Sequence, residues 1–193
     1  MLRTMRTPKQ LPSISFSLKY VNMADLKSTS PLFLREEELF QAMELLFFAY
    51  KAFTDDPDRI LDTIHFGRAH HRVIHFVGRN PGMPVFRLLE ILKITKQSLS
   101  RVLSQLVEEG YIEQKRGKDD GRQRLLYLTE KGQRLEKQLS SPQLARMAHA
   151  FRDAGAQSVA GFREVLMGML DERDAQLVTD LQQHRVAAAK EEE

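Results

Sequence analysis

The hydrophobic period changes between residues 69 and 128, and this change limits the possible folds more than any other feature of the sequence. Three short stretches repeat apolar residues at helical spacing, namely Ala69–Gly78, Val85–Leu92 and a segment from Thr95 to Glu109. Thr95 suits the N-cap of the third stretch, and Gly110 suits its C-cap. The sequence therefore predicts three short helices joined by brief turns.

Two strand-like stretches follow the third helix. Tyr111–Lys115 and Arg124–Leu128 are separated by the polar, glycine-bearing stretch Gly117–Gly121, which predicts a β-hairpin. Three short helices followed by a hairpin form a winged helix-turn-helix, here centred on residues 67–130. We therefore expect a mainly α fold with a small β-hairpin wing (α+β).

Longer helices are expected on both sides of this unit. Apolar residues recur at threes and fours over 34–53, and the proline-containing stretch Asp55–Asp58 is expected to end that helix. Thr129 suits the cap of a second long helix, and Asp153–Gly155 is expected to break it before a last helix at about 158–186.

The basic residues are concentrated in the middle of the chain. Residues 67–105 contain seven Lys or Arg and one acid, Glu90, so this stretch has a net charge of +6 on a chain whose total is +3. A local basic excess on a nearly neutral chain is typical of a surface that binds phosphates. Nucleic acid is therefore the expected partner.

The Thr95–Glu109 helix has the composition of a recognition helix. One side is apolar, and the other offers short hydrogen-bonding side chains and cations, with no acid before Glu108. Small hydroxyls allow close approach to a major groove, and Gln and Arg can read base edges. The alternative is an ordinary solvated face, which usually interleaves Glu with Lys. The expected DNA contacts are Lys93, Thr95, Lys96, Gln97, Ser98, Ser100, Arg101 and Gln105.

The expected hairpin is also basic. Its tip can reach an adjacent minor groove, where an arginine gains from the concentrated negative potential. Asp120 can hold the Arg122 guanidinium by a charge-assisted hydrogen bond, although a salt bridge confined to the turn is the alternative. The expected wing contacts are Lys115, Arg116, Lys118, Asp120, Arg122 and Arg124.

Ser98–Leu103 followed by Leu106–Glu113 resembles the recognition helix and first wing strand of the MarR (multiple antibiotic resistance regulator) family of bacterial transcriptional regulators. Asp120-x-Arg122 and Leu128–Gly132 resemble the Asp-x-Arg and Leu-Thr-x-x-Gly wing signature of that family. The resemblance implies a triangular homodimer in which the first and last helices of both chains interlock. It also implies that Arg122 enters the minor groove and that Asp120 orients it.

These patterns divide the chain into five parts. The run Leu45–Phe48 is apolar on every side of its helix, which requires burial on more than one side, as in a bundle covered by a partner. We expect a flexible basic N-terminal arm at 1–28, an N-terminal dimerisation helix and connector at 30–64, a winged helix-turn-helix DNA-binding domain at 65–130, C-terminal dimerisation helices at 131–188 and a disordered tail at 189–193.

The family resemblance also implies a small aromatic or anionic effector, bound between the dimer helices and the DNA-binding lobe. His71 and His75 stand one helical turn apart, a spacing that can chelate a metal, but no clear third ligand accompanies them, so we expect no metal site. Candidate effector-pocket residues are Phe47, Tyr50, Lys51, Phe53, His65, Phe66 and His71, with plain hydrophobic core as the alternative for each.

The composition excludes several other classes of protein. The chain has no cysteine, which excludes disulfides, thiolate zinc sites and regulation by thiol oxidation. No apolar run approaches the roughly 20 residues that span a bilayer. No carboxylate pair, glycine-rich phosphate loop or Ser/His/Asp order stands out, so we expect neither an enzyme nor a cofactor. The expected location is the cytoplasm, in association with the nucleoid.

The sequence thus predicts a homodimeric, sequence-specific regulator of transcription that binds double-stranded DNA at a pseudo-palindromic operator. We expect a repressor rather than an activator, tuned by a small-molecule effector. The main alternative is a sequence-tolerant DNA architectural protein, and a metal- or ligand-dependent enzyme is the other rival.

Overall fold

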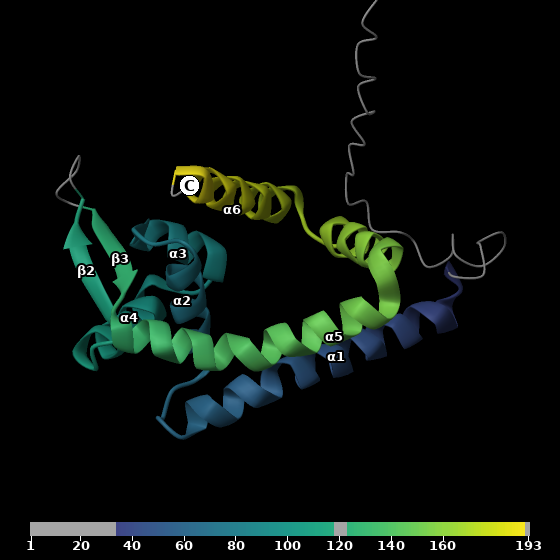
Figure 1. Cartoon of the computed structure of the whole chain (residues 1–193), viewed down its shortest axis with the longest axis horizontal. Coiled ribbons are helices and arrows are strands. Elements are labelled where there is room, and N and C mark those ends of the chain that lie inside the picture. The colour runs from purple at the N-terminus through teal and green to yellow at the C-terminus, as the bar shows by residue number, and fades with distance from the viewer. Residues whose placement is uncertain (1–33, 118–122, 192–193) are drawn as a thin grey trace, which may run out of the picture. The chain divides into compact units, whose positions relative to one another are not determined.

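The computed structural model describes residues 34–117 and 123–191, so the expected arm at 1–28 and the wing residues Lys118, Asp120 and Arg122 lie outside the described residues. The chain divides into two units, residues 1–41 and 42–193. The second unit contains everything discussed below apart from the first turns of α1. The elements, all labelled in Figure 1 apart from β1, are α1 (Glu36–Asp62), α2 (Arg68–Arg79), β1 (Met83–Pro84), α3 (Val85–Leu92), α4 (Lys96–Glu108), β2 (Ile112–Arg116), β3 (Arg124–Leu128), α5 (Glu130–Gly168) and α6 (Glu172–Glu191).

The three short helices and the hairpin expected between residues 69 and 128 are confirmed to within one residue at every end. The capping residues explain this agreement. The Thr95 hydroxyl accepts a hydrogen bond from the Ser98 backbone N–H (3.1 Å) and so starts α4. Gly110 follows α4 with a φ of +75°, a conformation that glycine adopts without strain.

A third strand, β1, was not expected. It pairs antiparallel with β3, so that the strand order is β1-β3-β2, and Met83 lies opposite Leu126. The two residues of β1 are too few to show an alternating pattern, and the second is a proline. Prolines are tolerated on an edge strand such as this one.

The core of the second unit lies where α2, α3 and α4 meet the sheet. It contains Val73 of α2, Leu88 of α3, Leu106 of α4 and Leu126 of β3, all completely buried. Leu61 of α1 and Leu139 of α5 are buried against the same core, so the two long helices are anchored to it. This packing turns the polar side of α4 outward.

The expected break in the first helix at Asp55–Asp58 is wrong, because α1 continues through Pro57 to Asp62. A proline inside a helix removes the hydrogen bond to the carbonyl four residues earlier, here that of Phe53. The Gln143 side chain of α5 donates to that carbonyl instead (3.1 Å). A residue 90 positions away therefore satisfies the backbone group that Pro57 leaves without its usual donor.

The break expected at Asp153–Gly155 is confirmed, since Gly155 is non-helical (φ 80°, ψ 165°) within the span of α5. The single last helix expected at 158–186 is wrong. The chain leaves α5 after Gly168 and starts α6 at Glu172, where Asp171 accepts a hydrogen bond from the Asp174 backbone N–H (2.7 Å). Helix α6 reaches Glu191, so it takes in residues 189–191, which we expected in a tail. Among the described helices, none is long and apolar enough to cross a membrane.

Candidate nucleic-acid interface

Helix α4 presents the expected polar face to solvent. Leu99, Val102, Leu103 and Leu106 form its buried face. On the opposite side Lys96, Gln97, Ser100 and Arg101 are exposed and line one open hollow of the surface. The face combines two cations with short hydrogen-bonding groups, and such groups can contact phosphates and the edges of bases.

Thr95 and Ser98 belong to the start of this helix. The Thr95 hydroxyl donates to Ser98 Oγ (2.8 Å) while it accepts from the Ser98 backbone N–H. Both side chains are exposed, and each hydroxyl keeps further hydrogen-bonding capacity beyond this mutual contact. The pair therefore fixes the N-terminus of α4 next to Lys96 and Gln97.

Lys93 lies just before α4, but its ammonium faces acids of α6. Its Nζ is 2.6 Å from Asp174 Oδ2 and 3.6 Å from Asp171 Oδ2, and the hydrogen bond to Asp174 raises the pKa of Lys93. Nearby, Arg87 of α3 pairs with Asp180 of α6 (3.2 Å). These pairs hold α6 against α3. Asp171 is a residue type that commonly caps the start of a helix. The expectation of one continuous last helix overlooked this signal.

Gln105 is also engaged within the protein. Its Oε1 is 2.9 Å from His70 Nε2 of α2, and its Nε2 donates to Glu109 Oε1 (2.9 Å). The structure therefore places Gln105 on the side of α4 that faces α2, half-buried, rather than among the open side chains around Arg101.

The described part of the wing places two arginines opposite each other. Arg116 of β2 pairs in register with Arg124 of β3, and both are exposed. Like charges directly opposite on neighbouring strands repel, and a bound anion relieves that repulsion. Lys115 pairs with Glu113 (2.7 Å) and lies 4.7 Å from the centre of the Tyr127 ring.

A cavity of about 180 Å³ lies between α1, α2 and α5. It brings together Tyr50, Phe53 and His71 of the expected effector residues. Burial, and next the neighbouring His75, lower the pKa of His71, which favours the neutral form of its imidazole. Phe47, Lys51, His65 and Phe66 do not line this cavity, and Phe66 is a core residue only 4% exposed.

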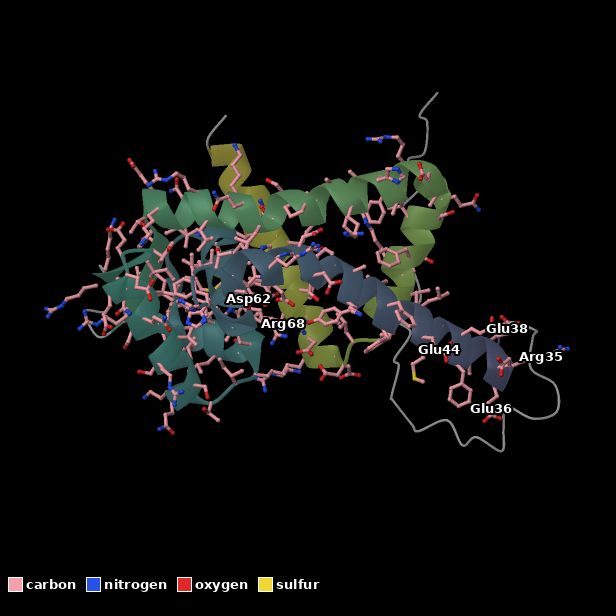
Figure 2. The ribbon with its side chains drawn as sticks, turned by 90° about the horizontal axis from the view of Figure 1, so that it is seen from below. Arg35, Glu36, Glu38, Glu44, Asp62 and Arg68 are labelled. Carbon is pink, nitrogen blue, oxygen red and sulfur yellow. The ribbon has the colours of Figure 1, made fainter. Side chains whose placement is uncertain are left out.

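Sequence reasoning missed other residues of the cavity wall. Arg68, Arg72 and His75 line it from the face of α2 that also carries His71, and their helical spacing was a usable signal. Arg68 stands at the start of α2, near the Asp62 end of α1 (Figure 2), and pairs with Asp58 (2.7 Å). Among the described residues, no group of three or more histidines or acids could hold a metal ion.

The MarR family model matches residues 66–123. The HTH-type transcriptional regulator PetP of Rhodobacter capsulatus is 54% identical over 140 residues, which are 72% of this chain and 84% of that protein. An identity of this size over most of the relative establishes membership of the same family.

Solved structures support the fold. A MarR family regulator from Silicibacter pomeroyi is 18% identical with a TM-score of 0.57, over 74% of this chain and 94% of that one. FabT of Streptococcus pneumoniae in complex with DNA is 19% identical with a TM-score of 0.53, over 76% and 99%. A mutant MarR from E. coli complexed with operator DNA is 21% identical with a TM-score of 0.52, over 74% and 100%. The chain therefore belongs to the MarR family and is a transcriptional regulator of the MarR type, with a winged helix-turn-helix fold.

Proposed function

We propose that this protein is a homodimeric repressor that binds a pseudo-palindromic double-stranded DNA site in a sequence-specific manner. The observation that carries the proposal is the exposed face of α4, where Lys96, Gln97, Ser100 and Arg101 stand together without an acid. A helix with this face fits a major groove, since its cations contact phosphates and its amide and guanidinium groups match base edges. A dimer bound across a promoter excludes polymerase from it, which favours repression.

The wing supplies the second DNA contact of the proposal. Arg116 and Arg124 lie opposite each other, and a phosphate between them offsets their mutual repulsion. The family resemblance assigns Arg122 to the minor groove with Asp120 as its partner. FabT and the E. coli MarR mutant were both solved with DNA, which supports DNA as the partner of this chain.

A second copy of the chain is the proposed partner of one apolar surface. We call this surface the α1–α5 apolar face. A soluble monomer rarely exposes so many large apolar side chains on two of its helices, and burial against a second copy removes them from water. The face consists of Met43, Leu45, Leu46, Phe47, Phe48 and Tyr50 on α1, Leu144, Phe162, Val165, Leu166 and Met167 on α5, and Met169 directly after α5.

The cavity between α1, α2 and α5 is the proposed effector site. The rings of Tyr50 and Phe53 suit an aromatic ligand, and Arg72 suits an anionic group. The site lies between a proposed dimerisation helix and the first helix of the DNA-binding domain. A ligand there changes DNA binding only if it prefers one arrangement of these helices to another.

Selection of bound fragments from the source genome, followed by titration at fixed salt, tests the proposal. We expect a preference of about a thousandfold or more for an inverted repeat over random duplex DNA. Equal affinity for both would contradict the proposal and favour the architectural alternative. Elemental analysis of the purified protein tests the rival hypothesis of a metal-dependent enzyme, because such an enzyme would contain a stoichiometric metal.

The Arg101→Ala variant tests the assignment of the α4 face. We expect it to lose about 1–3 kcal/mol of discrimination between the selected site and single-base variants of that site. Arg152→Ala removes the same charge from an exposed position of α5 and serves as the matched control. If Arg101→Ala weakened binding to all sequences evenly, base readout would lie elsewhere.

A further inference from the structure

His70 is held by hydrogen bonds at both ring nitrogens. Its Nδ1 accepts from the Gly67 backbone N–H (3.1 Å), and its Nε2 lies 2.9 Å from Gln105 Oε1 on α4. A carbonyl oxygen can only accept, so Nε2 carries the proton and donates to Gln105. The Gln105 amide then donates to the Glu109 carboxylate (2.9 Å). Only one arrangement of protons satisfies this series of hydrogen bonds.

The His70 ring is also fixed from its face. The Phe66 ring stacks on it at 4.5 Å between centroids with an interplanar angle of 7°. Phe66 is buried and packs edge to face against Tyr111, the residue before β2, with 5.2 Å between the ring centroids. The Lys131 ammonium of α5 lies 4.0 Å from the centre of the Tyr111 ring and donates to the Glu109 carbonyl (2.8 Å). The start of α2, the end of α4 and the start of α5 therefore meet around His70 and Tyr111.

We propose that His70 is a positioning residue for DNA recognition: its hydrogen bond to Gln105 sets the orientation of α4 on α2, and thereby the sequence preference of the protein. This inference rests on the proposed function. Gln105 lies about one helical turn beyond Arg101, so a shift at Gln105 moves the side chains proposed to read bases. The role of Gln105 is then internal, because its carboxamide oxygen and nitrogen are both engaged by protein groups.

The same turn of α2 faces two sites. His70 contacts the recognition helix, and the next residue, His71, lines the cavity between α1, α2 and α5. Phe66, which stacks on His70, lies in the connector that follows α1. The contact to α4 and the cavity wall therefore lie on adjacent residues of α2.

Three variants of the 193-residue chain test the proposal. His70→Phe keeps a ring against Phe66 but removes both hydrogen bonds. His70→Gln keeps a donor near the former Nε2 position. Gln105→Ala removes the acceptor from α4. Each is compared with the wild type by titration of the selected site, of single-base variants of that site and of random duplex DNA, with thermal unfolding as the check of folding.

We expect His70→Phe to reduce the preference for the selected site over random duplex by about tenfold or more. Each protomer loses its hydrogen bond to Gln105, and the free energy of one such bond corresponds to a change of about threefold to tenfold in an equilibrium constant. Affinity for random duplex should stay within about twofold, because the phosphate-binding cations remain. His70→Gln should recover most of the preference. The double variant His70→Phe/Gln105→Ala should lose no more than the larger single loss, since both changes break the same contact.

Other results overturn the proposal in distinguishable ways. If the wild type prefers the selected site and His70→Phe retains the full preference, the role of His70 is wrong while the proposed function stands. Gln105→Ala could instead change the preference at one base pair only, and its loss could add to that of His70→Phe in the double variant. Gln105 would then read that base directly. If the wild type shows no preference over random duplex, the proposed function fails and this inference fails with it.

Discussion

Gly132→Ala lowers the free energy of unfolding by about 3 kcal/mol or more, measured by urea denaturation. A Cβ atom at residue 132 lies 2.1 Å from the carbonyl oxygen of Tyr111, which is far inside van der Waals contact. That carbonyl also accepts the Thr129 backbone N–H (3.1 Å), so it cannot move without losing the junction between the wing and α5. The glycine of the Leu-Thr-x-x-Gly signature is thus required by close backbone approach.

Gly161→Ala is the control, at a helical glycine of α5 beyond the break at Gly155. Nothing lies within 4 Å of a Cβ atom at residue 161, so the substitution meets open space. The higher helix propensity of alanine should stabilise the protein by up to about 1 kcal/mol. Equal effects of the two substitutions would contradict the steric account of Gly132.

The double variant Leu45→Glu/Phe48→Glu is expected to be monomeric and to bind the selected DNA site at least about a hundredfold more weakly. Leu45 and Phe48 are 70% and 62% exposed within one chain and belong to the α1–α5 apolar face. Placing two carboxylates in an apolar interface costs several kcal/mol, because each loses hydration without gaining a partner. A monomer also contacts one half-site only, so its affinity falls further.

Sedimentation measures the mass of the variant, and titration measures its DNA affinity. Phe86→Glu is the control for the mass, since it places the same charge at a similarly exposed aromatic residue (59%) on α3, outside the apolar face. The control should remain dimeric. A dimeric Leu45→Glu/Phe48→Glu variant would show that a different surface joins the two copies.

The sequence predicted those parts of the fold that depend on neighbouring residues. Thr95 and Gly110 cap α4 through groups within a few positions, and the hairpin strands show their own pattern. The continuity of α1 through Pro57 could not be predicted this way, because the hydrogen bond to the Phe53 carbonyl comes from Gln143, 90 residues away. Strand β1 exists only through its pairing with β3.

The residues of the candidate site divide in the same way. Lys96, Gln97, Ser100 and Arg101 were predictable, since the apolar period of α4 determines which side chains face outward. The engagement of Lys93 by α6 and of Gln105 by His70 was not, because these contacts join residues 81 and 35 positions apart. The family resemblance implied an effector pocket, but only packing distinguishes Phe53, on the cavity wall, from Phe66 in the core.

In the proposed dimer the two α4 helices read successive major grooves, about 34–36 Å apart. The most direct test is the affinity for the selected site after insertion of about 5 bp, half a helical turn, between its half-sites. We expect the affinity to fall to nearly that for random duplex DNA, because the second half-site then faces away from its α4. Unchanged affinity would contradict it, since the two half-sites would then be bound independently of their spacing.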